Sequence, residues 1–455
     1  MTASDDSLKR GNSALRLMMK SIYVASIFVI GFWLMLKILH YPGGEIKLRT
    51  IPYPYKAGLS FAGDISGISS AEEFLSLQQY LCTEEFSPWG RGLGLELGTG
   101  FCFYDLTWES QFTLLDTAGV LNKNTGRIII DFIRAGYIDI LNGYGNIPDS
   151  LYSDELLDKG LNVLEQENLS IPIWINPSGD KFGYCLGSMP NQLGDNPGSP
   201  FYHTPYLTNA GIRYIESSNY TYVVGQDVRF GFKGFLKKNY ELFESLMKSS
   251  KSDRWDVNRE NLLLQPFAVD DSTEFFRFNR FIDGNPASVP EIIDAKFLAQ
   301  QLKKEVLDNL VLRNGYMILY TNYGENTSYN EWIPIEARQA LLELSKRAHD
   351  KEILVTTSSR LLNYNLVRKF LNWRWKHEKD FYNIYIDGVD LPAENQFDLD
   401  FENLRGLTFY TPEPQKTRIF YDGKIVSPIN INPPDEKEQA SVSVPWVWLK
   451  YPSGY

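Results

Sequence analysis

Short runs of apolar, β-type residues alternate with helix-like segments from residue 57 to residue 372. Strands separated by helices of about 10 to 15 residues are typical of βα units, whose strands lie parallel in one sheet. The expected strands are 57–63, 92–97, 134–141, 171–177, 211–217, 262–269, 315–322 and 352–358, and the expected helices are 70–82, 153–168, 290–308, 334–350 and 358–372. Seven or eight such strands favour a barrel, and we predict an α/β barrel over residues 57–380.

The end of the chain changes character because its apolar runs lack intervening helices. Asp422-Gly423 between two such runs is a hairpin signal, and we predict a small antiparallel β module over 381–430. The tail, 431–455, begins polar and closes on Trp446 and Trp448. It either lies back against the domain or forms an exposed strand that binds a partner.

The N-terminus carries the signal for a membrane anchor. Residues 21–36 contain no charge, and lysines at both ends can extend their ammonium groups to the two interfaces. We predict a cytoplasmic basic segment over 1–20, a transmembrane helix over 21–39 and a tether over 40–56. A cleaved signal peptide is the alternative, but no small-residue cleavage site follows the apolar run. The predicted protein is therefore single-pass, with its main domain extracytoplasmic, in the periplasm or at the cell surface.

Composition excludes one class of partner and leaves others open. The formal net charge is −11, and no basic stripe follows residue 20, which argues against nucleic acid. The 27 Tyr and 10 Trp suit carbohydrate contacts as well as ordinary cores. Cys82, Cys102 and Cys185 have no metal-site spacing, and either a Cys82–Cys102 disulfide or three free thiols fit the sequence.

Polar side chains follow many of the expected strands. In a parallel barrel the carboxyl ends of the strands converge, so these residues define a candidate pocket. Its members are Asp64, Glu96, Asp139, Asn142, Tyr144, Asn176, Asp195, His203, Tyr320 and Asn322. For Asp64 alone, a strand-end carboxylate bonded to backbone N–H groups is the alternative. The runs "RFGFKGF" and "FFRFNRF" are interpreted as amphipathic edges outside the pocket.

Three of these segments together resemble a known family. They are the strand "LSFAGD" that ends on Asp64, the segment "IDILNGYG", and "PIWIN" with the later "GD" and "YHT". With "YTNYG" and "VTTSSRLLNY", they resemble the polysaccharide-deacetylase (NodB-like) superfamily of carbohydrate esterases, over roughly residues 50–380. The resemblance implies an irregular (β/α)7 barrel and metal-dependent removal of acetyl groups from amino sugars.

The motifs depart from that family where its chemistry needs them. The family holds a divalent ion with one Asp and two His, and a second, adjacent Asp acts as the base. Here Gly63 precedes Asp64, so Asp64 fills the metal-ligand position and the base position is empty. The second segment contains no histidine, and Asn142 is a neutral, poor ligand for zinc. These departures predict a degenerate site without a metal cofactor.

Three functions remain open. The first is a degenerate deacetylase-like domain that binds, processes or helps export envelope polysaccharide, alone or with an envelope protein. The second is an active enzyme, using either zinc on Asp64, Asp139 and Asp195 or His203, or a glycosidase acid pair. Such a pair lies about 5 to 10 Å apart, and its candidates are Glu96, Asp105, Asp139 and Asp195. The third is a protein that only holds a partner at the membrane.

Overall fold

The computed structural model describes residues 45–65, 67–107, 112–177, 182–187, 191–228, 261–268, 274–284, 293–324, 332–392 and 397–455. The chain divides into two compact units, Met1–Lys47 and Leu48–Tyr455, and the second is the subject below. The predicted anchor over 21–39 and the run "RFGFKGF" lie outside the described residues. Within them, no helix combines the length and apolar character that a membrane span requires.

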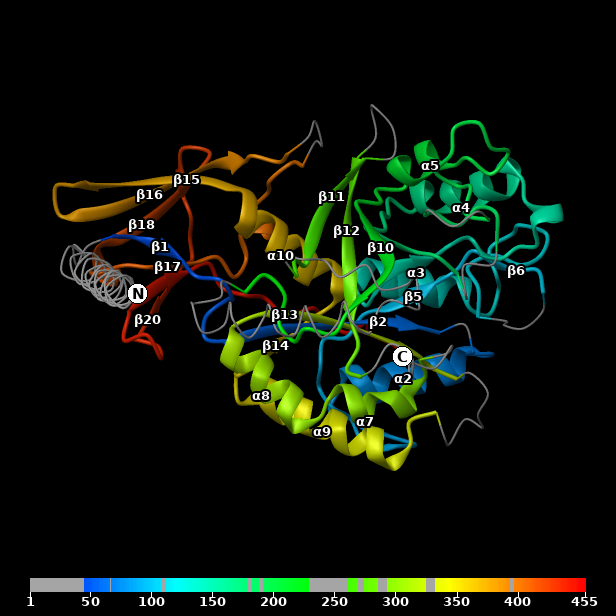
Figure 1. Cartoon of the computed structure of the whole chain (residues 1–455), viewed down its shortest axis with the longest axis horizontal. Helices are drawn as coiled ribbons and strands as arrows, with labels where there is room; N and C mark the ends of the chain where they lie inside the picture. The colour runs from blue at the N-terminus through cyan, green and yellow to red at the C-terminus, as the bar shows by residue number, and fades with distance from the viewer. Residues whose placement is uncertain are drawn as a thin grey trace, which may run out of the picture. The chain divides into compact units, whose positions relative to one another are not determined.

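A nine-stranded, mainly parallel sheet organises the fold, which is of the mixed α/β class (Figure 1). Its order is β11-β12-β10-β9-β7-β5-β2-β13, and β14 pairs with β2. The strands are β2 (Ala57–Asp64), β5 (Thr99–Phe101), β7 (Ile138–Asn142), β9 (Ile173–Ile175), β10 (Tyr214–Thr221), β11 (Leu264–Ala268), β12 (Glu274–Phe281), β13 (Tyr316–Asn322) and β14 (Ile353–Val355). Only β11 runs antiparallel to its neighbour, β12.

The strand pairing among the described residues stays open and does not close into a barrel. Strands β12 and β13 approach each other without a ladder of hydrogen bonds between them, and we call this junction the seam. Gln226 bridges this seam: its backbone exchanges hydrogen bonds of 2.8 and 3.1 Å with Tyr316 of β13. Its side-chain Nε2 donates to the carbonyl of Asn279 of β12 at 3.3 Å. Among the described residues, Gln226 therefore joins β12 to β13 where no continuous ladder does.

The helices cover both faces of the sheet. They are α2 (Ala71–Cys82), α3 (Gly126–Ala135), α4 (Asp154–Gln166), α5 (Thr204–Asn209), α7 (Leu298–Gln301), α8 (Lys304–Arg313), α9 (Ile335–His349) and α10 (Ser358–Phe370). In Figure 1, α7, α8 and α9 lie on one side of β2 and β13, and α10 lies on the other. Helix α2 begins where the Ser70 and Glu73 side chains form a capping box.

Helix α10 packs against the face of the sheet opposite α7, α8 and α9, which we call the inner face (Figure 1). The Ser358 hydroxyl donates to the Phe61 carbonyl at 3.0 Å and lies 3.1 Å from the Ser60 hydroxyl. On β10, the Tyr214 hydroxyl donates to Asn363 of α10 at 2.6 Å. A Cβ on Gly58 would lie 2.8 Å from the Leu361 side chain, so β2 needs small residues where the helix crosses it.

Several expected elements differ from those observed. Residues 92–97 form no strand, because Leu93 and Leu95 donate their backbone N–H groups to carbonyls at the end of α2. The expected helix 290–308 is interrupted before α8, where Lys303 has an extended backbone. Helix α3 was not predicted. The expected strand 262–269 corresponds to β11, which runs antiparallel to β12. The strand of this region that runs parallel to its neighbour β10 is β12.

The last part of the chain forms two small sheets. One contains β15 (Leu371–Glu378), β16 (Phe381–Val389), β18 (Thr417–Tyr421) and β19 (Lys424–Ile425), and the other contains β1 (Lys47–Leu48), β17 (Thr408–Tyr410), β20 (Asn430–Asn432) and β21 (Ser441–Ser443). Two-stranded pairs β3 (Phe86–Ser87) with β4 (Gly90–Arg91) and β6 (Tyr104–Asp105) with β8 (Gly145–Asn146) complete the strands.

The expected antiparallel module is a mixed sheet that begins ten residues earlier, at Leu371 rather than 381. Asp422 and Gly423 form the predicted hairpin turn between β18 and β19, both with positive φ. Strands β16 and β18, however, pair in parallel. The chain between them passes through β17 of the other sheet, so β18 enters beside β16 in the same direction.

The C-terminal tail lies against the domain. Leu449 donates its backbone N–H to the Glu96 carboxylate at 2.6 Å, and Arg360 donates to the Val447 carbonyl at 2.6 Å. The Tyr451 ring packs against Phe132 of α3 at 5.5 Å between centroids. Of the two arrangements that the sequence left open for the tail, the structure has the docked one.

Replacing Gln226 tests how the seam is held. Gln226→Ala removes the hydrogen bonds to the Asn279 and Leu262 carbonyls and leaves the buried Asn279 carbonyl without this donor. We expect the free energy of unfolding of the full-length chain to fall by about 1 to 3 kcal/mol in urea titrations. The matched control is Gln339→Ala, on the exposed face of α9. Equal stability of the two variants would show that Gln226 does not hold the seam.

Candidate functional site

Asp64 lies at the carboxyl end of β2 with its side chain buried. Asn142, at the end of β7, donates its amide Nδ2 to Asp64 Oδ1 at 3.0 Å. Tyr320, on β13, donates its hydroxyl to Asp64 Oδ2 at 2.8 Å. Three strands that are distant in sequence therefore meet at one carboxylate. Both carboxylate oxygens accept from neutral donors.

Three further residues extend this group across the inner face of the sheet. Arg280, on β12, lies over the rings of Tyr320 and Tyr220, with its guanidinium carbon 4.3 and 4.8 Å from their centroids. It donates to the Tyr220 hydroxyl at 2.9 Å and forms a 2.7 Å ion pair with Glu216 of β10. We refer to Asp64, Asn142, Tyr320, Arg280, Tyr220 and Glu216 as the Asp64 cluster.

Strand register explains why these side chains meet. Tyr220 is paired with Arg280 between β10 and β12, and Asn322 is paired with Asp64 between β13 and β2. In parallel strands, paired residues point to the same face of the sheet. Asn322 is buried beside Asp64 at the end of its strand. The structure thus brings together four of the ten candidates: Asp64, Asn142, Tyr320 and Asn322.

The electrostatics of the cluster keep Tyr320 a hydrogen-bond donor. Burial, followed by the charge of Asp64, raises the pKa of the Tyr320 phenol well above its ordinary value, and Arg280 opposes this shift. Glu216 pairs with Arg280, and Asp64 accepts hydrogen bonds from Asn142 and Tyr320.

Sequence analysis missed Arg280, Glu216 and Tyr220. The arginine falls in "FFRFNRF", whose alternation was interpreted as an amphipathic edge. Strand β12 is instead paired on both sides, and Arg280 is buried. A buried arginine needs a carboxylate partner, and "RYIES" supplies one in Glu216. A search for that partner would have found the pair.

Glu96 lies away from Asp64, at the amino side of β5, and it is buried. Its carboxylate accepts from Arg360 and Thr356 at the start of α10, and from the Leu449 backbone in the tail. The expected strand 92–97 would have placed Glu96 at a carboxyl end. Because the strand begins at Thr99, Glu96 instead ties the C-terminal tail to α10.

Asp139 also lies toward the amino end of its strand, β7. Its Oδ2 accepts from the backbone N–H of Ser359 in the first turn of α10 at 2.7 Å. Burial raises the pKa of Asp139 to about 7, and the hydrogen bonds from Ser359 and Thr357 oppose this shift. Asp139 therefore acts as a cap for the helix that fills the inner face.

Tyr144 and His203 belong to a buried aromatic cluster. The His203 ring lies 5.1 Å from Tyr144 and 5.2 Å from Trp174 between centroids. Its Nδ1 lies 2.9 Å from the Phe201 carbonyl. Burial lowers the pKa of His203 to about 4, so the imidazole is neutral near pH 7. These contacts give His203 a packing role.

Asn176 and Asp195 organise loops. Asn176 accepts from the Leu186 N–H at 2.9 Å and donates to its carbonyl at 2.7 Å, which closes the turn between them. Asp195 is half-buried, and desolvation raises its pKa while Arg277 opposes the shift. Asn176 is thus bound to Leu186, and Asp195 lies near Arg277 of β12.

No group of three or more His, Cys, Asp or Glu side chains among the described residues could hold a metal ion. Asp64, Asp139 and His203, which the zinc hypothesis combined, have separate partners as described above. Cys82, Cys102 and Cys185 are all free thiols, so the Cys82–Cys102 disulfide is not formed. What the Asp64 cluster offers chemically is a buried set of hydrogen-bond donors and acceptors beside two tyrosine rings.

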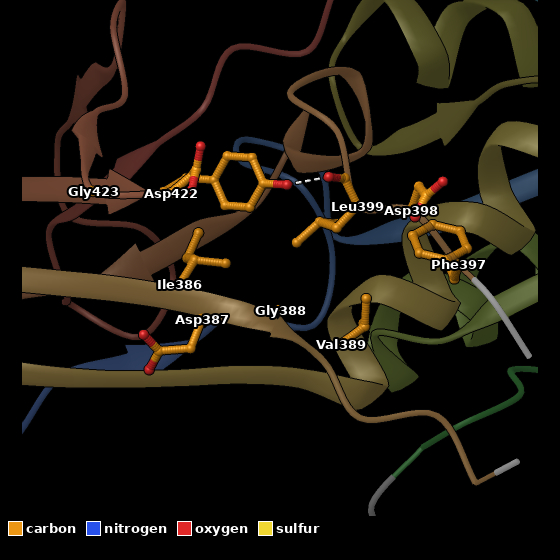
Figure 2. Close-up of a pocket in the computed structure, with 10 residues that line it drawn as sticks. Ile386, Asp387, Gly388, Val389, Phe397, Asp398, Leu399, Asp422 and Gly423 are labelled. Carbon is orange, nitrogen blue, oxygen red and sulfur yellow. Dashed lines mark hydrogen bonds between the residues drawn. The ribbon is translucent and has the colours of Figure 1, made fainter. Parts of the chain in front are cut away.

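A separate hollow of about 550 Å³ lies where the β16–β18 sheet meets residues 397–399 (Figure 2). Its acidic side chains, Asp387, Asp398 and Asp422, are exposed. Tyr421 also lines it, and the Tyr421 hydroxyl donates to the Leu399 carbonyl. None of the ten candidate residues is among those lining it, and we assign it no role.

No protein-family profile matches the sequence, and no curated protein matches it at a significant level.

The buried carboxyl of Asp139 gives the next prediction. With a pKa of about 7 in the folded chain and about 3.9 when unfolded, the folded state binds more protons between these pH values. Stability due to Asp139 therefore falls as pH rises through this window. We expect the wild-type unfolding free energy, relative to Asp139→Asn, to fall by up to about 1.4 kcal/mol per pH unit. Urea titrations from pH 4 to 8 measure it.

The pKa of His203 does not disturb this comparison. The stability that His203 contributes rises with pH between about 4 and 6.5, which is the opposite direction. Because His203 is present in both wild type and Asp139→Asn, this contribution cancels in the difference between their unfolding free energies. Asp380→Asn, in the exposed turn between β15 and β16, is the matched control and should give a flat difference. A flat difference for Asp139→Asn would show that Asp139 is ionised throughout.

Proposed function

We propose that this chain is a deacetylase-like protein that binds glycan at the Asp64 cluster without hydrolysing it. One observation carries the proposal: both oxygens of Asp64 accept hydrogen bonds from neutral donors, Asn142 and Tyr320. In the family that the sequence resembles, the equivalent carboxylate binds a cation beside two histidines. Here its neighbours are an amide and a phenol, which suit the hydroxyls of a sugar.

The arrangement of the strands supports an irregular (β/α)7 barrel as the finer description. Seven parallel strands run in the order β12-β10-β9-β7-β5-β2-β13. The two outer members of this series come together at the seam that Gln226 bridges. An incompletely paired seam is what makes such a barrel irregular. We therefore propose that the sheet is a barrel with one unpaired seam, and that α10 packs at the amino ends of its strands.

Sugar chemistry fits the mixture of groups in the cluster. A hydroxyl both donates and accepts, so it can pair with the Asp64 carboxylate and with the amides of Asn142 and Asn322. Ligand sites combine apolar surface with a few fixed polar groups. The rings of Tyr220 and Tyr320 supply the apolar surface, and Arg280 and Glu216 fix its orientation.

Binding of chitotetraose, an oligomer of N-acetylglucosamine, tests the proposal. We expect the full-length chain to bind it in titration calorimetry and Asp64→Asn to bind at least about tenfold more weakly at this site, because a charge-assisted hydrogen bond is lost. Tyr320→Phe should weaken binding less, because it removes only one donor. Asp380→Asn is the control and should bind as wild type.

Product assays on the same proteins decide between binding and catalysis. We expect no acetate release and no new reducing ends, with or without added zinc. Acetate release that Asp64→Asn abolishes would replace the proposal with an active esterase. New reducing ends would replace it with a glycosidase. Binding that is unchanged in both Asp64→Asn and Tyr320→Phe would remove the cluster as the site.

We propose that a transmembrane anchor over residues 21–39 holds this domain at the cell envelope. We propose a single-pass protein with the domain outside the cytoplasm, where it would meet polysaccharide or an envelope protein. Its uncharged run and flanking lysines support this topology.

Replacing two central residues of the run tests the anchor. Val29→Asp with Ile30→Asp places two charges mid-span, at a cost of about 2.5 to 3.5 kcal/mol each. We expect the wild-type chain, but not this variant, to stay with membranes during alkaline carbonate extraction. Gly31→Ala is the control. Protease added outside sealed spheroplasts should digest the domain, and its protection would reverse the topology.

A further inference from the structure

A second pocket lies between the C-terminal tail and the main body of the fold. It has a volume of about 280 Å³ and is lined by Tyr55, Gly94, Leu95, Glu96, Ala348, His349, Lys351, Val355 and Trp448. The rings of Tyr55 and Trp448 stand perpendicular, at 88° and 6.3 Å between centroids. Together they form an aromatic corner, with aliphatic side chains completing the apolar wall.

Trp448 is held in place although its side chain is exposed. It is 46% exposed, one of the largest apolar side chains that the described surface presents to water. Both of its neighbours in the tail are fixed: Arg360 bonds the Val447 carbonyl, and Glu96 bonds the Leu449 N–H, each at 2.6 Å. These bonds position the indole in advance, so that binding a ligand costs little ordering of the tail.

The open side of the pocket is polar. His349 and Lys351, at the end of α9, are both exposed at the rim. The His349 Nδ1 is fixed by the Ser345 carbonyl at 2.7 Å, which directs the other ring nitrogen outward toward Gly94 and Glu84. Lys351 has a positive φ and follows the helix end directly. The pocket therefore combines two aromatic rings with hydrogen-bonding groups at its mouth.

We infer that this pocket is a second glycan-binding site, separate from the Asp64 cluster, that holds one sugar unit against Trp448. Its volume lies just under the range of about 300 to 1,000 Å³ of drug-sized sites, which suits one ring of a chain that continues into solvent. A pyranose has apolar C–H faces and polar edges. The aromatic corner can contact the apolar faces, and His349 and Lys351 at the rim can hydrogen-bond the polar edges.

A purely apolar occupant, such as a leucine or phenylalanine side chain of a peptide, fits less well. Unlike a sugar, it would gain no hydrogen bonds from the rim imidazole and ammonium groups, which would stay hydrated. The site stands on its own residues and does not depend on the function proposed for Asp64. A chain with two separated sites could hold one polysaccharide at two points, which raises the overall affinity without new contacts.

The test compares variants of the full-length chain in chitotetraose titrations. We expect Trp448→Ala to lose one class of site, with affinity there at least about tenfold lower, because a central aromatic anchor is removed. Val447→Ala, the neighbouring and equally exposed apolar residue of the tail, is the control and should retain both classes. Saturation-transfer NMR should show contact between the sugar ring protons and an indole that is absent in Trp448→Ala.

Asp64→Asn separates this site from the proposed function. If the inference holds, Asp64→Asn and Trp448→Ala each remove a different class of site. If Asp64→Asn loses all binding while Trp448→Ala binds as wild type, the inference would be overturned and the proposed function would stay intact. Equal loss in Val447→Ala and Trp448→Ala would also overturn it, since the tail would then act only structurally. Binding of a phenylalanine-rich peptide in place of chitotetraose would assign the pocket to protein.

Discussion

The packing of α10 against the inner face of the sheet is the constraint on which the other features depend. The helix occupies the space near the amino ends of the strands, where β2 has Gly58 and Ser60. Polar groups at that end are consumed in holding it: Asp139 caps its first turn, and Glu96 pairs with Arg360. At the carboxyl ends, the described residues place the Asp64 cluster, whose Asp64 carboxylate accepts hydrogen bonds from Asn142 and Tyr320.

The sequence predicts the parts of the site that depend on strand ends alone. Strands β2, β7 and β13 are regular apolar runs, so the positions of Asp64, Asn142, Tyr320 and Asn322 follow from where those runs stop. Sheet order and register cannot be read from the runs. That Tyr320 would reach Asp64, and that Arg280 would lie over Tyr320, depends on which strands become neighbours. Pairing between distant segments is set by the whole core, not by any local pattern.

The failures have local physical causes. The alternation in "GLGLEL" predicts a strand that ends near Glu96. The N–H groups of Leu93 and Leu95 in this run instead pair with the end of α2, and strand β5 begins only at Thr99. His203, a candidate for the pocket, is buried among Tyr144, Trp174 and Tyr184 and does not reach Asp64. The β16–β18 pairing was expected to be antiparallel because no helix separates the runs, yet a strand of another sheet serves as the crossover. In each case a tertiary partner overrode the local pattern.

The charge balance of the Asp64 cluster argues that binding metal would require more than adding histidines. A divalent cation needs lone pairs directed at it, whereas Asn142 and Tyr320 direct an N–H and an O–H toward Asp64. Tyr320 is further held protonated by burial and by Asp64 itself. Binding a metal at this site would therefore require replacing the two donors as well as supplying ligands. This arrangement supports the proposal that the Asp64 cluster recognises a polar, uncharged ligand.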